Sequence, residues 1–308
     1  MRGFPAVVLC CLVACRASSS SNDAGPTNDA AASDAFSTVD GASTAIGGDR
    51  PVTVHVPPGY QAGTPMPLVV MLHGYTASGD IEEAYLQLTP LADARGFLYA
   101  HPDGTIDSLN NHFWNATDAC CNVNASTVDD STYLSTVIKQ IAARYTVDPK
   151  RVFLVGHSNG AFMSHRMACE HADQIAGIVS LAGAQWTDLT KCKPSAPVNV
   201  LQIHGTADTV ILYNGGTVLT KPYPSAPTTV ADWVTLDGCA TTADTSAAAI
   251  DLDNVLPGNE TTVSRWSAGC SAGSRVELWT IVGGSHIPSL SATFSSGLVD
   301  FLLAHPKP

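Results

Sequence analysis

The stretch RVFLVGHSNGAFMSHRMACEHAD (151–173) places a Gly-x-Ser-x-Gly pentapeptide between an apolar run and a helical pattern. The pentapeptide alone is a weak signal, because glycine and serine are both common residues. Between a strand and a helix, however, the turn is strained and lifts the hydroxyl of Ser158 above the sheet, while the small Gly156 and Gly160 relieve crowding. The first N–H groups of the helix point at the same spot. The stretch therefore predicts a nucleophilic serine.

Short β-branched runs alternate with helical patterns along the rest of the chain. Several runs are apolar on both faces, as strands of a parallel sheet covered by helices on both sides must be. Predicted strands are 52–56, 68–73, 97–101, 151–156, 175–182, 198–204 and 275–282. Predicted helices are about 80–95, 130–145, 158–170, 227–236 and 291–304. The pattern predicts an α/β fold with a mostly parallel central sheet and helices on both faces. The short segment 183–197 predicts that no large lid domain is present.

A serine hydroxyl attacks well only when a base removes its proton and an acid orients that base. Among ten histidines, His286 stands apart in the loop GGSHIPS, directly after the apolar run RVELWTIV. For the acid, Asp208 follows the run VNVLQIH, in a loop expected at the same edge of the sheet. Alternative acids in a helix or a polar stretch are Asp232, Asp237, Asp251 and Asp253. The chain order Ser158, Asp208, His286 is that of an α/β-hydrolase triad.

Acyl transfer also requires two N–H donors for the oxyanion. One candidate is the backbone N–H of Asn159, directly after the serine. The other is the N–H of Tyr75 or of its neighbour Thr76, in the turn HGYTASG (73–79). A plain strand-to-loop turn is the alternative interpretation of this segment. Such chemistry requires no metal and no organic cofactor, so we expect neither.

Composition bounds the partners of the chain. Its 308 residues, 45% hydrophobic and 14% charged, are enough for one large core. The net charge of −12 and the scattered lysines and arginines provide no basic patch for phosphates, which excludes nucleic acid as an expected partner. We expect a monomer whose partner is an ester substrate.

The N-terminus has the pattern of an export signal. Arg2 precedes an apolar stretch (4–14) that is too short to span a bilayer. Leu12-Val13-Ala14-Cys15 resembles a bacterial lipobox, which predicts a lipoprotein signal peptide over 1–14 and lipidation of Cys15. Ordinary secretion is the alternative. Residues 15–48 are rich in serine, alanine and aspartate and predict a flexible tether, followed by a catalytic domain over 49–308. We expect an exported lipoprotein that is extracellular or anchored to the outer membrane.

Six cysteines remain beyond this N-terminal segment. An even number in an exported chain suggests three disulfides. The absence of a Cys-x-x-Cys spacing makes a zinc site the weaker alternative. The cysteines are Cys120, Cys121, Cys169, Cys192, Cys239 and Cys270.

Several blocks resemble, in order, the feruloyl esterase and polyhydroxybutyrate depolymerase-like serine esterases, a carbohydrate esterase family 1-like branch of the α/β-hydrolases. They are LVVMLHGYTASG, WNATDACC, VDD at 128–130, GHSNGAFMSHRMACEHAD, IHGTADTV and GGSHIPS, within about residues 50–304. The resemblance implies Ser158 as nucleophile, Asp208 as acid and His286 as base, with Tyr75 and Asn159 as oxyanion donors. Many relatives carry Trp-Pro after the histidine, whereas Ile287-Pro288 stands here. That difference removes an aromatic group from the pocket edge.

The resemblance supports a more specific expectation for how the six cysteines pair. Cys239 and Cys270 bracket a polar excursion, and a bond between them would stabilise it. The other four would then pair across, tying the loop 102–128 to the helix after Ser158 and to the segment 183–197. A bond between the adjacent Cys120 and Cys121 is also possible.

The expected protein is a secreted or lipid-anchored serine esterase that forms an acyl-enzyme. The preferred substrates are feruloyl or acetyl esters of plant cell-wall polysaccharide, and hydroxybutyrate oligomers are second. Trp114 and Trp186 are candidate rim aromatics for a sugar or phenolic ring, although each could equally be a packing residue. A serine peptidase and a non-catalytic surface-binding lipoprotein are the alternatives from other classes.

Overall fold

The computed structural model describes residues 45–218 and 220–307. The predicted signal peptide, its lipidation site Cys15 and the tether up to residue 44 lie outside the described residues. Ile46 is buried in the core, and the amide of Gly47 donates to Gln140 Oε1 at 2.8 Å. The folded part therefore begins before residue 49, because an isoleucine that we assigned to the tether packs into the core.

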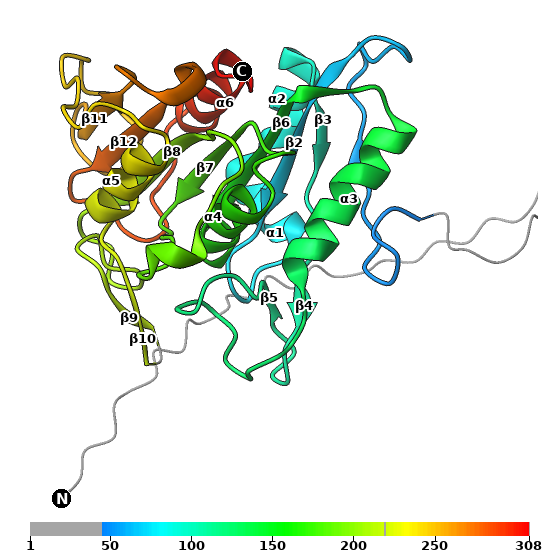
Figure 1. Ribbon diagram of the computed structural model, residues 1–308, viewed down its shortest axis with the longest axis horizontal. Coiled ribbons are helices and arrows are strands. Elements are labelled where there is room, and N and C mark those ends of the chain that lie inside the picture. The colour runs from blue at the N-terminus through cyan, green and yellow to red at the C-terminus, as the bar shows by residue number, and fades with distance from the viewer. Residues whose placement is uncertain (1–44, 219, 308) are drawn as a thin grey trace, which may run out of the picture. The chain divides into compact units, whose positions relative to one another are not determined.

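An eight-stranded sheet forms the centre, in the order β1-β3-β2-β6-β7-β8-β12-β11 (Figure 1). The strands from β3 to β12 are parallel, and the two edge strands, β1 and β11, are antiparallel to their neighbours. The bounds are β1 Val54–His55, β2 Met66–Leu72, β3 Leu98–Ala100, β6 Val147–His157, β7 Gly177–Leu181, β8 Asn199–Gly205, β11 Thr261–Trp266 and β12 Val276–Ile281. The predicted mostly parallel α/β fold is confirmed.

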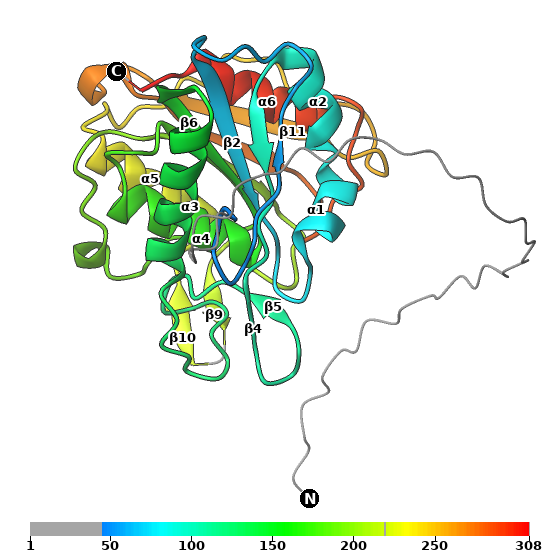
Figure 2. The same ribbon diagram turned by 90° about the vertical axis from the view of Figure 1, so that its right-hand side faces the viewer.

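Helices cover both faces of this sheet, as Figure 2 shows from the side. They are α1 Gly79–Leu86, α2 Leu88–Arg95, α3 Asp130–Arg144, α4 Asn159–Glu170, α5 Ala226–Leu236 and α6 Phe294–Ala304. Alternate residues of β2 belong to the two resulting cores: Leu68 and Val70 pack with α3, α4 and α5, whereas Val69 and Met71 pack with α1, α2 and α6. Both faces of the central strands are therefore buried, which explains their continuous apolar runs.

The single helix predicted over about 80–95 is two helices. Gln87 separates α1 from α2 and has left-handed backbone angles (φ 52°, ψ 50°). Pro90 lies in the first turn of α2, where its missing N–H is tolerated, but the same residue could not continue a helix from α1. The carboxylate of Glu83 accepts from the N–H groups of Leu88 and Thr89 and so caps the second helix.

Five strands were not predicted. β11 begins within the polar stretch 237–262, where no strand was predicted. The other four form two short hairpins, β4 Thr105–Ile106 with β5 His112–Phe113, and β9 Gly216–Val218 with β10 Lys221–Tyr223. Strands of two or three residues carry too few side chains to show a period of two.

Three disulfides link the six cysteines. Cys239 bonds to Cys270, as expected, and Cys169 bonds to Cys192. The expected tie from the loop 102–128 to α4 is wrong, because Cys120 bonds to its neighbour Cys121. Cys169 lies in the last turn of α4, with its Cα 4.8 Å from that of Cys192, and these two cysteines form a disulfide with each other. Among the described residues, no helix has both the length and the apolar character needed to span a membrane.

Candidate active site

Ser158 occupies a strained turn between β6 and α4. Its backbone angles (φ 52°, ψ −119°) lie in a region that residues with a side chain rarely adopt. Two glycines make the turn possible: a Cβ at Gly156 would lie 2.2 Å from the carbonyl oxygen of Gly160, and a Cβ at Gly160 would lie 1.9 Å from that of Leu72. The N–H of Ser158 donates to the carbonyl of Leu181 at 2.8 Å, which fixes the turn to β7.

Two loops bring a histidine and a carboxylate to this serine. Asp208 follows β8 and His286 follows β12, and these two strands are neighbours. His286 Nε2 lies 2.9 Å from Ser158 Oγ, and His286 Nδ1 lies 2.7 Å from Asp208 Oδ2. The three residues that the sequence singled out therefore form one hydrogen-bonded line at the carboxyl edge of the sheet.

The carboxylate of Asp208 is buried and held in its ionised form. Burial by itself would raise its pKa, but hydrogen bonds from His204 and His286 and from the Val210 N–H outweigh burial and lower the pKa below the ordinary range. Its second oxygen, Oδ1, accepts from the N–H groups of Val210 and Ile211 at 2.8 and 2.9 Å. A fixed negative charge thus faces the histidine ring.

The hydrogen-bond partners of His286 determine which of its ring nitrogens carries the proton. Asp208 Oδ2 can only accept, so Nδ1 carries the proton and the lone pair of Nε2 faces the serine hydroxyl. Burial lowers the pKa of His286 below 6.5 and outweighs the opposing effect of the Asp208 carboxylate. The ring is therefore neutral at neutral pH, which is the state required of a general base.

The alternative acids contact other partners. Asp232 accepts from Gln185 Nε2 at 2.8 Å, and Asp237 accepts from the Val198 N–H at 3.3 Å. Asp251 presents its carbonyl to Ser291, and the side chain of Asp253 accepts from the Val255 N–H. Within residues 45–218 and 220–307, Asp208 is the only one of the five candidates whose carboxylate forms a hydrogen bond with a histidine ring.

Two backbone N–H groups next to Ser158 have no hydrogen-bond partner among the described residues: those of Tyr75 and Asn159. Thr76, the alternative to Tyr75, donates its N–H to the carbonyl of His112 at 3.0 Å. The turn passes close to the serine, since a Cβ on Gly74 would lie 3.5 Å from Ser158 Cβ. Of the two donors that the sequence left open, the geometry thus favours Tyr75.

A buried pair beneath the serine was missed by the sequence analysis. The Nδ1 atom of His157, the residue directly before Ser158, lies 3.1 Å from Glu82 Oε1 of α1. Its other ring nitrogen lies 3.0 Å from the carbonyl oxygen of His286. Glu82 Oε2 accepts from the N–H of Gly74 at 3.1 Å. Both side chains are almost fully buried. No local sequence pattern around Glu82 indicates that its side chain contacts His157.

Trp114 is not a rim aromatic, because its side chain is fully buried. Its indole N–H donates to the carbonyl of His73 at 3.1 Å, and its ring packs on the His73 ring. The amide side chain of Asn159 holds its backbone from both sides, accepting from the Trp114 N–H at 2.7 Å and donating to its carbonyl at 2.9 Å. Trp114 therefore fixes the loop beside the site.

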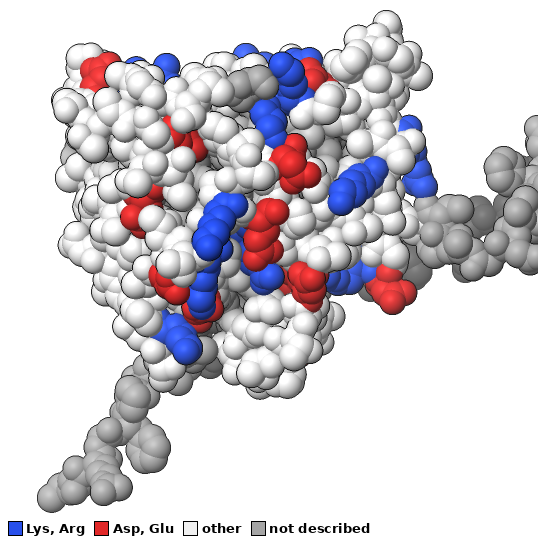
Figure 3. All heavy atoms as spheres, in the orientation of Figure 1, with Lys and Arg blue, Asp and Glu red and all other residues white. Residues whose placement is uncertain are grey.

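Trp186 lines two adjoining cavities of about 560 and 370 Å³, and the larger of the two is mainly polar. The ion pair between Lys191 and Asp118 lies in both, and Lys221 of β10 lies beside them. Figure 3 shows how lysine and arginine side chains alternate with acidic ones on the face that it views. The predicted contact of Trp186 with substrate stays a prediction, and the polar surroundings suit sugar hydroxyl groups.

In the part of the chain that the structure describes, one group of side chains has the spacing of metal ligands: His73, Asp103 and His112. His73 is already fully engaged, because Nδ1 lies 2.8 Å from the carbonyl of Gly74 and Nε2 accepts from the Gly104 N–H at 2.9 Å. Asp103 Oδ1 accepts from the Gly79 N–H at 2.7 Å. With both of its nitrogens used, His73 does not fit a metal ligand. The group instead pins the turn after β2.

Comparison with known proteins matches residues 51–256 to a family described as esterase PHB depolymerase. The chain belongs to this family of esterases. It is 30% identical over 245 residues to feruloyl esterase B of Piromyces equi, covering 77% of this chain and 42% of the relative. It is 28% identical over 252 residues to the putative esterase NocK of Nocardia uniformis subsp. tsuyamanensis, covering 78% of this chain and 71% of the relative.

The fold has solved counterparts among esterases. The structure of an acetyl xylan esterase from Aspergillus awamori aligns with a TM-score of 0.56 at 15% identity, covering 82% of this chain and 94% of the other. Identity at this level shows the shared fold alone. The chain spans less than half the length of the Piromyces relative, so that protein contains much that has no counterpart here.

Proposed function

We propose that this chain hydrolyses carboxylic esters through an acyl-enzyme on Ser158. The observation that carries the proposal is the hydrogen-bonded line from Ser158 Oγ through His286 to Asp208. His286 Nε2 takes the hydroxyl proton as Oγ attacks the ester carbonyl. The tetrahedral intermediate then collapses, the bond to the alkoxy oxygen breaks, and His286 passes its proton to the leaving alcohol. Water, deprotonated by the same nitrogen, attacks the acyl-enzyme and releases the acid.

The oxyanion of each intermediate would accept from the N–H groups of Tyr75 and Asn159. Both groups lack a partner among the described residues, and Asn159 begins α4, whose N-terminal dipole favours negative charge. A donor of this kind is worth about 3–4 kcal/mol in transition-state stabilisation. Because both donors are backbone groups next to fixed turns, they need no rearrangement when charge develops.

Feruloyl or acetyl esters of plant cell-wall polysaccharide are the proposed substrates. The name of the Piromyces relative supports the feruloyl class, and the larger, mainly polar cavity beside Trp186 supports a sugar-bearing substrate. Oligomers of hydroxyalkanoates are the second class, supported by the description of the matching family. The proposed partner is thus an ester carried on a polymer or oligomer.

We also propose that the protein is exported as a monomer and anchored through a lipid on Cys15. The apolar stretch before Cys15 and the lipobox-like Leu12-Val13-Ala14-Cys15 motivate this proposal. Three disulfides fit an oxidising compartment outside the cytosol. Labelling with radioactive palmitate would mark the wild type but not Cys15→Ser, and equal labelling of both would contradict the anchor.

The function is tested by initial rates on methyl ferulate, p-nitrophenyl acetate, acetylated xylan and a hydroxybutyrate trimer. Ser158→Ala should lose at least about a thousandfold on every substrate that the wild type hydrolyses. Ser164→Ala is the matched control, because this buried serine of α4 bonds to the Gly160 carbonyl and not to His286. An inert wild type, or a fully active Ser158→Ala, would refute the esterase proposal.

Two further measurements separate the rival functions. A serine peptidase would also cleave peptide p-nitroanilides, which we expect to stay intact. A non-catalytic binding protein would not react with a fluorophosphonate, whereas an activated Ser158 hydroxyl should be labelled within minutes.

A further inference from the structure

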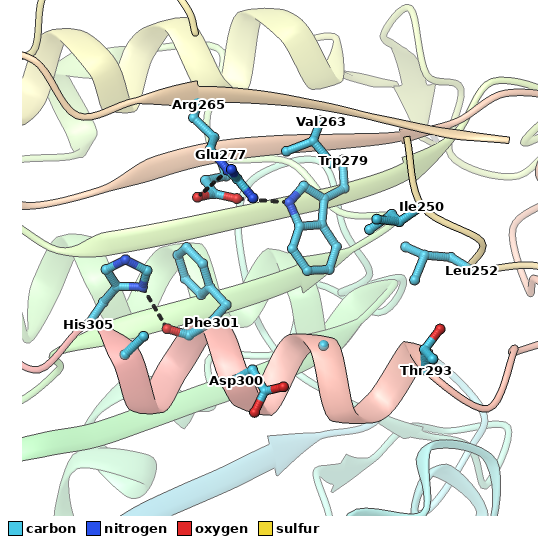
Figure 4. A pocket seen from close by; sticks show the side chains of 12 residues that line it. Ile250, Leu252, Val263, Arg265, Glu277, Trp279, Thr293, Asp300, Phe301 and His305 are labelled. Atoms are coloured by element: carbon cyan, nitrogen blue, oxygen red, sulfur yellow. Dashed lines mark hydrogen bonds and ion pairs between the residues drawn. The ribbon is translucent and has the colours of Figure 1, made fainter. Parts of the chain in front are cut away.

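Another cavity, separate from the two beside Trp186, lies between the β11–β12 pair and α6 (Figure 4). Its volume is about 400 Å³, and its lining includes none of Ser158, Asp208 and His286. The esterase proposal does not use it. Figure 4 shows Trp279 extending from the strands and Phe301 from the helix into the same space.

The walls of this cavity are apolar. Leu252, Val263, Trp279 and Phe301 line it, and each is buried to more than nine-tenths. On the helix side Gly297 presents no side chain: a Cβ there would stand 3.5 Å from the Trp279 ring, in ordinary contact. The wall thus consists of ring and aliphatic surface, which favours a flat apolar body.

One end of the cavity is polar, and its charges are already neutralised. Glu277 is buried, with Oε1 3.2 Å from Arg265 Nε and 3.8 Å from an Arg275 nitrogen, and with Oε2 accepting from the Trp279 indole N–H at 2.9 Å. Asp300 pairs with Arg95. No lining acid among the described residues is therefore left for a cationic ligand.

Arg265 keeps unused donors at this end. It approaches Glu277 through Nε, and its terminal nitrogens form no hydrogen bond with a described residue. Its side chain is 38% exposed, so those nitrogens can be reached. They can donate to an oxygen of a ligand.

His305 supplies the complementary acceptor. Its Nδ1 lies 2.6 Å from the Phe301 carbonyl oxygen, which can only accept, so Nδ1 carries the proton. Burial, with help from the nearby Arg275 and Arg265, lowers the pKa of His305, and the ring is neutral. Nε2 therefore carries a lone pair, and Figure 4 shows it turned away from the Phe301 carbonyl toward the strands.

We propose that this cavity binds a small neutral phenol or aryl alcohol. The hydroxyl group donates to His305 Nε2 and accepts from Arg265, while the ring lies between Trp279 and Phe301. A ligand carboxylate would place its lone pairs next to the lone pair of His305 Nε2 and its negative charge next to that of Glu277. An ammonium group would meet Arg265 and find no free acid. An ether has an acceptor but no donor for His305.

Calorimetric titration of Ser158→Ala protein tests this proposal independently of ester hydrolysis. 4-Ethylphenol should bind at least about tenfold more tightly than 4-ethylanisole and 4-ethylbenzoate, because only the phenol both donates and accepts. No binding of the phenol at millimolar concentration, or equal binding of phenol and anisole, would overturn the proposal.

Two variants locate the site. Gly297→Leu should abolish phenol binding by filling the space beside Trp279, whereas Gly297→Ala, with its Cβ in ordinary contact, should retain it. Should Gly297→Leu fail to fold, His305→Phe serves, since it removes the acceptor and should reduce the preference for phenol over anisole to within about twofold. Unchanged binding and preference in the folded variants would place the phenol elsewhere and refute the assignment.

Discussion

The side chains of Glu82 and His157 lie 3.1 Å apart beneath Ser158, and each also holds a backbone group of the site. His157 Nε2 faces the carbonyl of His286, and Glu82 accepts the N–H of Gly74 in the turn that carries Tyr75. Both partners of the imidazole can only accept, and they outweigh burial and raise the pKa of His157, which favours a ring protonated on both nitrogens. The pair thus connects the loop of the proposed base to the turn of the proposed oxyanion donor.

Glu82→Gln should therefore lower kcat by up to about a hundredfold with little change in KM, because the two loops lose a common anchor. Glu82 raises the pKa of His157 against the effect of burial, so the pair is charged below that pKa and is lost as pH rises through it. The groups facing the ring are Glu82, Asp208, His286 and Tyr85. The loss of the charged pair at high pH should appear as an alkaline limb in the pH profile of kcat. Glu82→Gln should remove that limb.

Asp80→Asn is the matched control, since the side chain of this α1 residue is exposed and forms a much weaker ion pair than Glu82 does. A merely structural role of the pair would reduce stability and leave the pH profile of kcat unchanged. The comparison therefore needs both melting curves and full profiles for the two variants.

The acid limb of the pH profile reports His286. Its pKa lies below 6.5 because burial outweighs the Asp208 carboxylate, and only the neutral ring can act as base. kcat/KM should rise through a pKa below 6.5 and stay level above it up to the alkaline limb. Rates on p-nitrophenyl acetate from about pH 4 to about pH 9 would measure this limb. A midpoint clearly above 6.5 would contradict the assignment.

Removal of the carboxylate should be costly without disturbing the fold. Asp208→Asn should reduce kcat about ten-thousand-fold, because an amide cannot hold His286 in the required tautomer. Asp232→Asn, which alters a carboxylate bonded to Gln185, should keep nearly full activity. Nearly full activity in Asp208→Asn together with a large loss in Asp232→Asn would contradict the assignment of Asp208 as the acid.

Asp237 should make the protein more stable in mild acid. Burial raises its pKa to about 7, against 3.8 for the free group, so the folded state keeps a proton that the unfolded state loses. Stability from this residue is lost as pH rises from about 4 to about 7, by about 4 kcal/mol. Asp237→Asn should therefore gain stability relative to wild type at pH 8 but not at pH 4. Urea melts at both pH values, with the exposed Asp173→Asn as control, would measure the difference.

The Cys239–Cys270 bond should support stability without entering the chemistry. It closes a separation of 31 residues, for which chain entropy gives about 3–4 kcal/mol. The double variant Cys239→Ser/Cys270→Ser should melt at lower denaturant concentration and, where folded, keep wild-type kcat. A large loss of kcat in folded protein would instead link this excursion to the site.

The central strands and the Ser158 turn were predictable because their signals are local. Runs such as 152–155 are apolar on both faces, and the loops with Asp208 and His286 follow directly from such runs. β11 was missed because an edge strand is apolar on one face at most, and TTVSRW mixes polar and apolar residues. Pro90 marked the break between α1 and α2 but was outweighed by the long helical pattern. The contact of Glu82 with His157 depends on how α1 packs, which no local pattern encodes.

Asn159 serves the fold and the proposed chemistry with different atoms. Its backbone N–H has no hydrogen-bond partner among the described residues, while its side chain forms hydrogen bonds with both backbone groups of Trp114. An aspartate would set an oxygen against the Trp114 carbonyl, and a smaller residue would release the loop. The second variable position of the Gly-x-Ser-x-Gly motif, which is Asn159 here, is therefore restricted to one residue type in this chain. Searches that treat that position as a wildcard would group this enzyme with proteins whose neighbouring loop is held by other means.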